Sequence, residues 1–152
     1  MDLLIQSHGD NDHIGGLSNI LEAMQVERIL TSVPDKIEHD KVDHCWRGQV
    51  WVWDEVLHPA KDSNLSGNDC SCVLKVSIDS NAILFTGDIE ARAEQLILKR
   101  DAEKLSSSVL IAPHHGSLTS SAPKFIAAVM PEYVLFAIGY GNRFGFPKKD
   151  II

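Results

Sequence analysis

The segment from His8 to His13 reads HGDNDH and places four metal-binding side chains within six residues. His8 and His13 offer imidazole nitrogens, and Asp10 and Asp12 offer carboxylate oxygens, which are ligands of zinc and manganese in proteins. In an irregular turn, one His and Asp pair can face one cation and the second pair another, provided that a later carboxylate joins the two half-sites. The alternative is a turn in which Asn11 or Asp12 only caps the next helix, but such a cap leaves both histidines unexplained. The segment therefore predicts the first half of a two-metal centre.

Two later turns can complete this centre. Asp88 ends the sequence ILFTGD, and His114 and His115 lie in PHHGS, each after an apolar run that is typical of a buried strand. Taken alone, Asp88 is typical of a helix N-cap, and the two histidines are typical of a loop bonded to backbone carbonyls. If the carboxyl ends of the three strands meet, however, Asp88 can bridge two cations and a late histidine can complete one site.

The apolar pattern predicts an α/β domain built from short strands and amphipathic helices. With 152 residues and 44% hydrophobic composition, the chain is predicted to form one domain over 1–152 with a substantial core. Segments 34–47 and 59–68 are predicted to be irregular, 79–81 to be a hairpin turn and 139–147 to be a glycine-rich loop. The predicted strands cover 3–5, 28–30, 50–56, 73–78, 82–85, 109–112 and 133–138, and the predicted helices cover 17–24, 89–100 and 124–129.

Two details concern the faces of strands. Within strand 50–56, Trp51 and Trp53 are predicted on the face opposite the valines, which include Val52. Cys70 and Cys72 are predicted to share one face of a strand. The chain has three cysteines without zinc-knuckle spacing, so we predict packed or free thiols and neither a disulfide framework nor a structural zinc site.

The charge balance limits the kind of ligand. The formal net charge is −7, which argues against a general electrostatic grip on nucleic acid. Two divalent cations would reverse the charge locally, so a phosphate substrate remains compatible with the composition if it binds at the metals. The sequence shows no leader segment and no apolar run of transmembrane length, and we expect this region to have no membrane insertion of its own.

Six motifs together resemble the metallo-β-lactamase fold and, more narrowly, the soluble domain of ComEC-type DNA-internalisation competence proteins. The resemblance implies a mixed α/β (α+β) fold, an αββα sandwich with the metal cleft at one edge. The motifs that carry it are SHGDNDHIGG at 7–16, VLHP at 56–59, NDCSCVL at 68–74, ILFTGD at 83–88, PHHGS at 113–117 and GNRFGFP at 141–147.

The resemblance also implies roles for the residues that match these motifs. His8 and Asp10 would bind one metal, Asp12 and His13 the other, and Asp88 both. Either His114 or His115 would supply the late histidine, and we favour His114 because it is closer to the strand end. Further residues are predicted to shape the site: Asn68, which falls near another histidine of many relatives, and Ser117, Asn142 and Arg143.

The chain departs from the family pattern in three ways. Strands that normally precede the first metal motif are missing, so the chain is expected to be a fragment of a larger protein. Asp10 stands where classical relatives carry histidine, which favours oxygen donors and makes manganese a rival to zinc. Phe146 stands where close relatives are expected to carry histidine, which removes one outer polar contact or ligand.

The function implied by the resemblance is that of a metal-dependent phosphodiesterase or nuclease in natural transformation. Two divalent ions, zinc or manganese, would bind a phosphate of single-stranded DNA, with Asp12 and Asp88 as catalytic residues, and the non-transported strand would be degraded. The parent would be a bacterial inner-membrane channel protein with this soluble domain on its extracytoplasmic side. The alternatives are a metallo-hydrolase of a small ester or lactam, and a degenerate module that regulates or docks onto the DNA channel.

Overall fold

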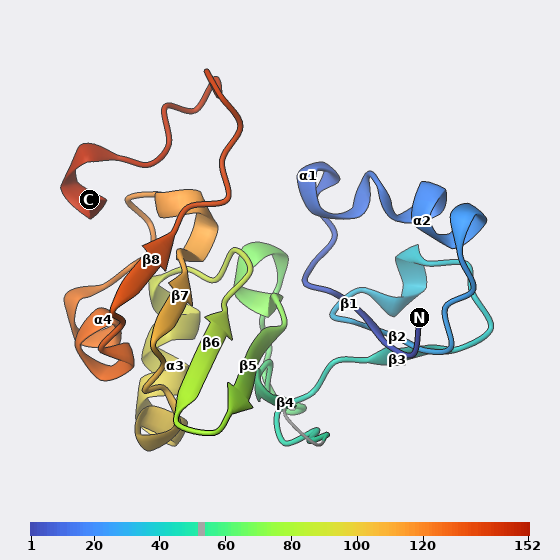
Figure 1. Ribbon diagram of the computed structural model, residues 1–152, viewed down its shortest axis with the longest axis horizontal. Coiled ribbons are helices and arrows are strands. Elements are labelled where there is room, and N and C mark those ends of the chain that lie inside the picture. The colour runs from blue at the N-terminus through green and yellow to red at the C-terminus, as the bar shows by residue number, and fades with distance from the viewer. Residues whose placement is uncertain (52–53) are drawn as a thin grey trace.

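Two β-sheets pack against each other in the computed structural model, which describes residues 1–51 and 54–152 (Figure 1). One sheet has the order β1-β2-β3 and is parallel, and the other has the order β4-β5-β6-β7-β8 and is mixed. The strands are β1 Leu4–Gln6, β2 Ile29–Thr31, β3 Val42–His44, β4 Asp54–His58, β5 Val73–Ile78, β6 Asn81–Phe85, β7 Val109–Ile111 and β8 Tyr133–Leu135. The α-helices are α1 Asn11–Ile14, α2 Leu17–Ala23, α3 Ala91–Asp101 and α4 Pro123–Val129, and the 3-10 turns are η1 Pro34–Lys36, η2 Gly67–Cys70, η3 Ala102–Lys104, η4 Pro113–Gly116 and η5 Lys149–Ile151.

The larger core lies between the five-stranded sheet and the helices α3 and α4. Leu84 and Leu110 of the central strands meet Ile97 of α3 and Phe125 of α4, and all four side chains are fully buried. Burial of each such side chain is worth about 1.5–3 kcal/mol relative to exposure. The layer therefore fixes β6 and β7, the two strands that lead into Asp88 and the histidine pair.

The three-stranded sheet is smaller and completes its core with the other sheet. Leu30 of β2 and Cys45 pack with Val56 of β4 and Cys72, so the second core joins the two sheets. Helices α1 and α2 lie beside the three-stranded sheet, whereas α3 and α4 lie beside the five-stranded sheet (Figure 1). The predicted αββα layering is confirmed.

Packing between the sheets is incomplete near α2. A cavity of about 510 Å³ opens there, lined mainly by apolar side chains that include Ile5, Leu17, Leu74 and Ile111. Phe85 of β6 also faces this cavity and keeps 41% of its surface exposed. The inner layer is therefore less fully packed than the layer beneath α3 and α4.

Most predicted elements are present, with three corrections. Segment 34–47 contains β3, which the periodicity missed because Val42–His44 has a single apolar residue and pairs only as the edge of a parallel sheet. Segment 50–56 is not one strand, because Val50 forms an antiparallel bridge with Glu55 and β4 begins at Asp54. The predicted faces of Val52 and Trp53 lie outside the described residues. Strand β8 ends at Leu135, three residues before the predicted end at 138.

The cysteines also differ from the predicted strand positions. Cys70 lies in the turn η2 and Cys72 just before β5, so the two do not share the face of a strand. All three cysteines are free thiols, as predicted; Cys45 and Cys72 are buried. Burial raises the pKa of the Cys72 thiol well above its ordinary value, which keeps it protonated.

The α-helices within residues 1–51 and 54–152 are at most 11 residues long. None of them combines the necessary length with sufficient apolar character.

Candidate metal centre

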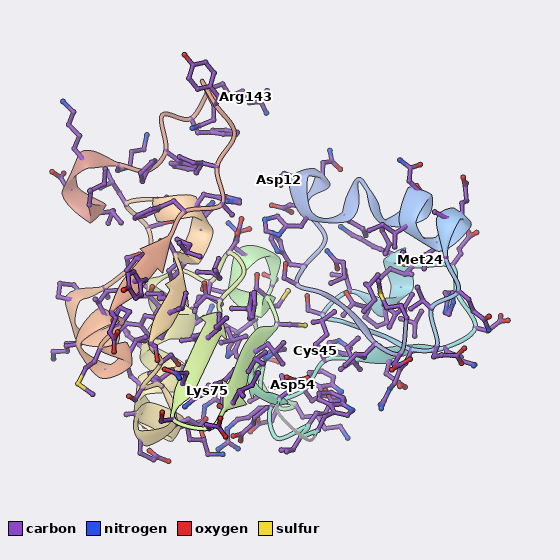
Figure 2. All side chains as sticks on the ribbon, viewed as in Figure 1. Asp12, Met24, Cys45, Asp54, Lys75 and Arg143 are labelled. Atoms are coloured by element: carbon purple, nitrogen blue, oxygen red, sulfur yellow. The ribbon has the colours of Figure 1, made fainter. Side chains whose placement is uncertain are left out.

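The predicted convergence of three strand ends is present in the structure. Strand β1 leads into Ser7 and His8, β6 leads into Asp88, and β7 leads into the turn η4 with His114 and His115. Helix α1 adds Asp12 and His13 from the opposite side of the seam between the sheets. Figure 2 shows Asp12 on the side of α1 that is nearest to the five-stranded sheet.

Asp88 lies at the centre of this arrangement. Its Oδ1 lies 3.2 Å from Nε2 of His13, and its Oδ2 lies 3.7 Å from Nε2 of His8, 3.4 Å from Nε2 of His115 and 4.0 Å from Nε2 of His114. The carboxyl group is nearly buried, with 4% of the residue exposed. One carboxylate therefore faces four imidazole nitrogens, which is the geometry expected of a bridging ligand.

The half of the site on the α1 side is the tighter of the two. Asp12, His13, Asp88 and His115 each offer one ligand atom, and these four atoms lie within 4.8 Å of one another. The Nε2 atoms of His13 and His115 are only 3.2 Å apart, and Asp12 Oδ2 lies 3.3 Å from His115 Nε2. Two unprotonated imidazole nitrogens repel at this distance, whereas a proton or cation between them is stabilised.

The second half contains His8, Asp10, Asp88 and His114. Asp10 Oδ2 lies 3.7 Å from Nε2 of His8. His8 is 1% exposed, and within the described part of the chain its Nε2 has no hydrogen-bond partner. A buried polar atom without a partner is costly, and a cation held between these donors would satisfy it.

The ring orientations on the N-terminal side are set by Ser7. Its Oγ lies 3.1 Å from Nδ1 of His8 and 3.1 Å from Nδ1 of His13, so both Nε2 atoms are turned toward Asp88. The Ser7 carbonyl accepts hydrogen bonds from Ser32 Oγ at 2.8 Å and from the Cys72 backbone N–H at 2.9 Å. Ser7 was not predicted as a site residue, although it directly precedes His8.

The position of Asp88 depends on the glycine before it. Gly87 has a φ of +54°, and a Cβ there would lie 2.8 Å from the Cβ of Ser71 and 3.0 Å from that of Ser7. Ser71 Oγ accepts a hydrogen bond from the Asp88 backbone N–H at 3.1 Å. The predicted alternative role for Asp88, a helix N-cap, is not what the structure shows, because Glu90 occupies that position in α3.

The helix-cap alternative for the first motif is likewise not observed. The N-cap position of α1 is occupied by Asp10, which makes no side-chain capping hydrogen bond. Asn11 and Asp12 lie inside the helix, so neither takes the capping role that the alternative required. The acidic side chains of this segment are therefore free to face the site.

The two late histidines are held by different partners. His114 Nδ1 lies 3.1 Å from Glu90 Oε1, and His115 Nδ1 lies 2.7 Å from the carbonyl oxygen of Ala137. Our preference for His114 as the single late ligand differs from this geometry, because His115 Nε2 is closer to Asp88 and also reaches Asp12. The turn η4 presents both rings, one toward each half of the site.

Glu90 was likewise not predicted as a site residue. Its Oε1 also accepts a hydrogen bond from Thr119 Oγ1 at 2.9 Å and one from Asn68 Nδ2 at 3.4 Å. Asn68 therefore contacts the residue that holds His114. The contact joins the N-cap of α3 to η4, two segments far apart in the chain, so no local sequence pattern indicates it.

The other predicted site-shaping residues lie around the pocket. Ser117 Oγ lies 3.0 Å from Thr119 Oγ1, within the turn that follows the histidine pair. Asn142 closes the glycine-rich loop by donating to the Phe146 carbonyl at 2.9 Å and accepting from its N–H at 2.9 Å. Arg143 lines the cavity into which the cluster opens. Phe146, which stands in place of an expected histidine, packs against the ring of His115 with centroids 6.2 Å apart.

The electrostatics of the cluster favour an ionised carboxylate at Asp88 and a neutral imidazole at His8. Burial opposes ionisation of Asp88, but its hydrogen bond to His13 and the nearby histidine charges outweigh burial and lower its pKa. The same hydrogen bond raises the pKa of His13. Burial lowers the pKa of His8, so this ring is neutral near pH 7 and keeps a free lone pair for a cation.

The cluster opens into a cavity of about 380 Å³. Its walls combine acidic, imidazole, cationic and aromatic side chains from both sides of the seam. They are Asp10, Asn11, Asp12, Asp88, His114, His115, Arg143, Phe144 and Phe146. The donor set, the shared carboxylate and the unpartnered His8 nitrogen fit divalent cations, and the cavity gives a ligand access to them.

Comparisons with known proteins show similarity to one superfamily and to several larger curated proteins. The sequence model described as the Metallo-beta-lactamase superfamily matches residues 1–139. Competence protein ComA of Neisseria gonorrhoeae is 36% identical over 155 residues, which cover 99% of this chain and 22% of that protein. The uncharacterized protein YcaI of Escherichia coli is 38% identical, covering 97% of this chain and 20% of YcaI. Recombination protein 2 of Haemophilus influenzae is 33% identical, covering 100% of this chain and 19% of that protein.

The chain thus spans about a fifth of the length of these curated relatives. A solved structure, that of Igni18, a novel metallo hydrolase from the hyperthermophilic archaeon Ignicoccus hospitalis, matches with a TM-score of 0.54 and 18% sequence identity. The match covers 88% of this chain and 62% of that one. The two proteins share a fold.

Proposed function

Because the chain belongs to the metallo-beta-lactamase superfamily, we propose that its cleft is a metal-dependent hydrolytic centre that cleaves phosphodiester bonds of single-stranded DNA. Members of this superfamily are hydrolases that commonly use divalent metals, and a His and Asp cluster of the appropriate kind is present. We infer that the substrate is single-stranded DNA and that the bond cleaved is the phosphodiester. We further infer that the centre holds two metal ions, either manganese or zinc.

The observation that carries the proposal is the bridging position of Asp88 between two donor groups. Three carboxylates and four imidazoles face one cleft, so the donor set is richer in oxygen than one built from histidines alone. Oxygen donors favour manganese more than sulfur-containing or purely imidazole sites do. Two cations separated by a shared carboxylate suit a phosphodiester, whose attacking and leaving oxygens each need charge stabilisation.

We assign each residue of the cluster a role in holding the metals or in activating water. Bound divalent ions would supply Lewis acidity at the phosphate and acidify a water molecule. His8, Asp10, Asp88 and His114 would hold one ion, and Asp12, His13, Asp88 and His115 the other. Asp12 is the most exposed of the three carboxylates, and it orients the attacking water and accepts its proton.

Arg143 would assist on the outer side of the pocket. Its guanidinium lines the same cavity as Asp12 and Asp88, and a guanidinium matches the geometry of phosphate oxygens. Attack by the water forms a new P–O bond while the bond to the leaving sugar oxygen breaks. Arg143 neutralises charge on the non-bridging oxygens during this exchange.

The setting of this activity is also a proposal. Two of the relatives are named for competence or recombination, and the chain corresponds to about a fifth of each. We infer that the domain serves DNA uptake as part of a larger bacterial inner-membrane protein, on the extracytoplasmic side. There it would degrade the strand that is not transported.

Cleavage of end-labelled single-stranded DNA with manganese or zinc tests the function. We expect wild-type protein to cleave, and Asp12→Asn to lower the rate by about 100- to 10,000-fold because the water loses its proton acceptor. Asp62→Asn, an exposed acidic position in the loop after β4, is the matched control and is expected to cleave normally. Equal cleavage by wild-type protein and Asp12→Asn would refute the proposal.

The same preparations separate the alternatives. Metal analysis that finds no bound divalent ion after loading would favour a docking module without catalysis. Hydrolysis of a nitrophenyl ester or a lactam without hydrolysis of DNA would favour a small-substrate hydrolase. Both outcomes contradict the phosphodiesterase proposal.

A further inference from the structure

A stack of planar side chains rises from the candidate metal centre toward solvent. The Phe146 ring lies nearly parallel to the His115 ring, at an interplanar angle of 21°. Phe144 stacks in turn on Phe146, with centroids 5.6 Å apart and an angle of 19°. The Arg143 guanidinium carbon lies 4.8 Å from the centroid of Phe144. We call His115, Phe146, Phe144 and Arg143 the aromatic stack.

The loop that carries this stack is held by the Asn142 side chain and by a backbone hydrogen bond to the turn η4. Asn142 bridges the loop to Phe146, and the Lys148 backbone N–H donates to the Gly116 carbonyl at 3.0 Å. The second contact ties the loop to the turn that bears the histidine pair. The stack is therefore fixed relative to the metal centre, and Figure 2 shows Arg143 at the outer end of the loop.

The outer end of the stack is unusually exposed for such apolar side chains. Phe144 keeps 55% of its surface exposed, although aromatic rings gain most by burial. Phe144 and Phe146 also line the same cavity as Asp10, Asp12 and Asp88. A ligand whose reacting group lies between the acidic residues can thus place a flat group against Phe144.

The charges near the stack indicate an anionic ligand. Arg143, Lys148 and Lys149 lie within seven residues of one another in a chain whose net charge is −7. Lys148 Nζ lies 5.2 Å from the centroid of Phe146. Aromatic platforms flanked by cations are the usual means by which proteins hold single-stranded nucleic acid without reading its sequence.

We propose that an unpaired nucleobase of the DNA strand stacks on Phe144 in place of the Arg143 guanidinium. Arg143 then contacts the phosphate at the metal centre, and Lys148 contacts the phosphate next to it. This inference rests on the proposed function and specifies how that site recognises its substrate. Bases inside a duplex are already stacked and paired, so the platform selects single strands. Since every base has a π face, it selects them with little sequence preference.

Fluorescence anisotropy tests the platform without cleavage. The probe is a fluorescein-labelled thymidine strand of about twelve nucleotides, and calcium replaces the catalytic metal as an oxygen-seeking cation. We expect Phe144→Ala to weaken binding by roughly 5- to 100-fold, because one stacking contact is lost. Phe144→Trp restores binding because it restores a π face. Tyr133→Ala, at an exposed aromatic position at the far end of β8, is expected to bind like wild type.

An abasic strand of the same length separates stacking from other effects. Wild-type protein and Phe144→Ala are expected to bind this strand equally, since it offers phosphates but no base. The stacking proposal is wrong if Phe144→Ala binds the thymidine strand as tightly as wild type does. It is also wrong if the substitution weakens binding of the abasic strand as much as binding of the thymidine strand. A blunt duplex that competes better than the single strand also overturns it.

The outcomes separate this inference from the proposed function. Base-dependent binding without phosphodiester cleavage in manganese or zinc would retain the platform and refute the hydrolytic activity. Cleavage of single-stranded DNA with the same kcat/KM in wild type and Phe144→Ala would retain the activity and refute the platform.

Discussion

The two sheets contribute to the metal centre in different ways. The five-stranded sheet carries a large core with α3 and α4, in which ten buried residues pack together. Within residues 1–51 and 54–152, the three-stranded sheet shares a core of four buried residues with the other sheet, beside a cavity of about 510 Å³. Yet the three-stranded region supplies His8, Asp10, Asp12 and His13, more candidate ligands than the better-packed region.

This difference shows two ways to position a ligand. Asp88 and the histidine pair follow strands that apolar packing holds in place. His8 and His13 depend more on polar contacts, because Ser7 holds both rings and the Ser7 carbonyl is held in turn by Ser32. Hydrogen bonds fix direction more precisely than apolar contacts, but a small core leaves the whole region less stable.

The largest effect should come from removing a core side chain from each region. Phe125→Ala in the large core should lower the free energy of unfolding by about 3–5 kcal/mol, because it removes a fully buried ring and leaves a cavity. Leu30→Ala in the small core should cost about 2–3 kcal/mol, near the lower end for such changes, because the neighbouring space can partly collapse. Urea unfolding measures both values.

Hydrogen exchange sharpens this prediction. Leu30→Ala should speed exchange in β1 to β3 while β6 and β7 keep their protection, whereas Phe125→Ala should affect both sheets. Identical exchange patterns in the two variants would show that the regions do not differ in local stability.

A smaller effect is expected from the residues that orient the ligands. Ser7→Ala should weaken manganese binding by about 10- to 100-fold, because two imidazole rings lose their orienting contact. Glu90→Gln, on the better-packed side, should weaken it less because Glu90 orients only His114. Isothermal titration calorimetry measures both affinities, with Ser18→Ala on the exposed side of α2 as the control. A larger loss for Glu90→Gln would reverse the comparison.

The smallest effect concerns the ion pair that joins the two regions. Arg47, which follows β3, donates two hydrogen bonds of 2.5 Å to Asp101 at the end of α3. Asp101→Asn should reduce stability at pH 7 by about 1–2 kcal/mol, a value reduced by the partial exposure of Arg47. As a control, Asp43→Asn removes an exposed pair with Arg28 and should cost less than about 1 kcal/mol.

The pH dependence of this loss has a definite sign. The hydrogen bond from Arg47, which outweighs burial, lowers the pKa of Asp101 in the folded protein. The stabilisation of the folded protein by this ion pair is therefore complete above the unfolded pKa of Asp101, near 4. It disappears as the pH falls through the lower folded pKa. Thermal unfolding of wild type and Asp101→Asn should converge in acid. A difference that stays constant from pH 7 into acid would contradict the ion-pair explanation.

The sequence by itself determined which residue types gather in the candidate site, and it predicted most of the strands that lead to them. The apolar runs that lead into His8, Asp88 and His114 predict buried strands, since only a buried segment needs such composition. The residue types of HGDNDH predict cation binding, because helix capping would not require two histidines. Local patterns of this kind are properties of short segments, and short segments can be read without knowing the fold.

Only the tertiary structure decided which side chains complete and orient the cluster. Strand β3 lacks an apolar run, and the contacts of Ser7 with His13 and of Glu90 with His114 join separate elements. The relative closeness of His115 to Asp88 follows from the left-handed backbone of η4, with φ values of +46° and +56° at His114 and His115. These features depend on the packing of two sheets across a seam, and no local pattern encodes distances between segments that are far apart in the chain.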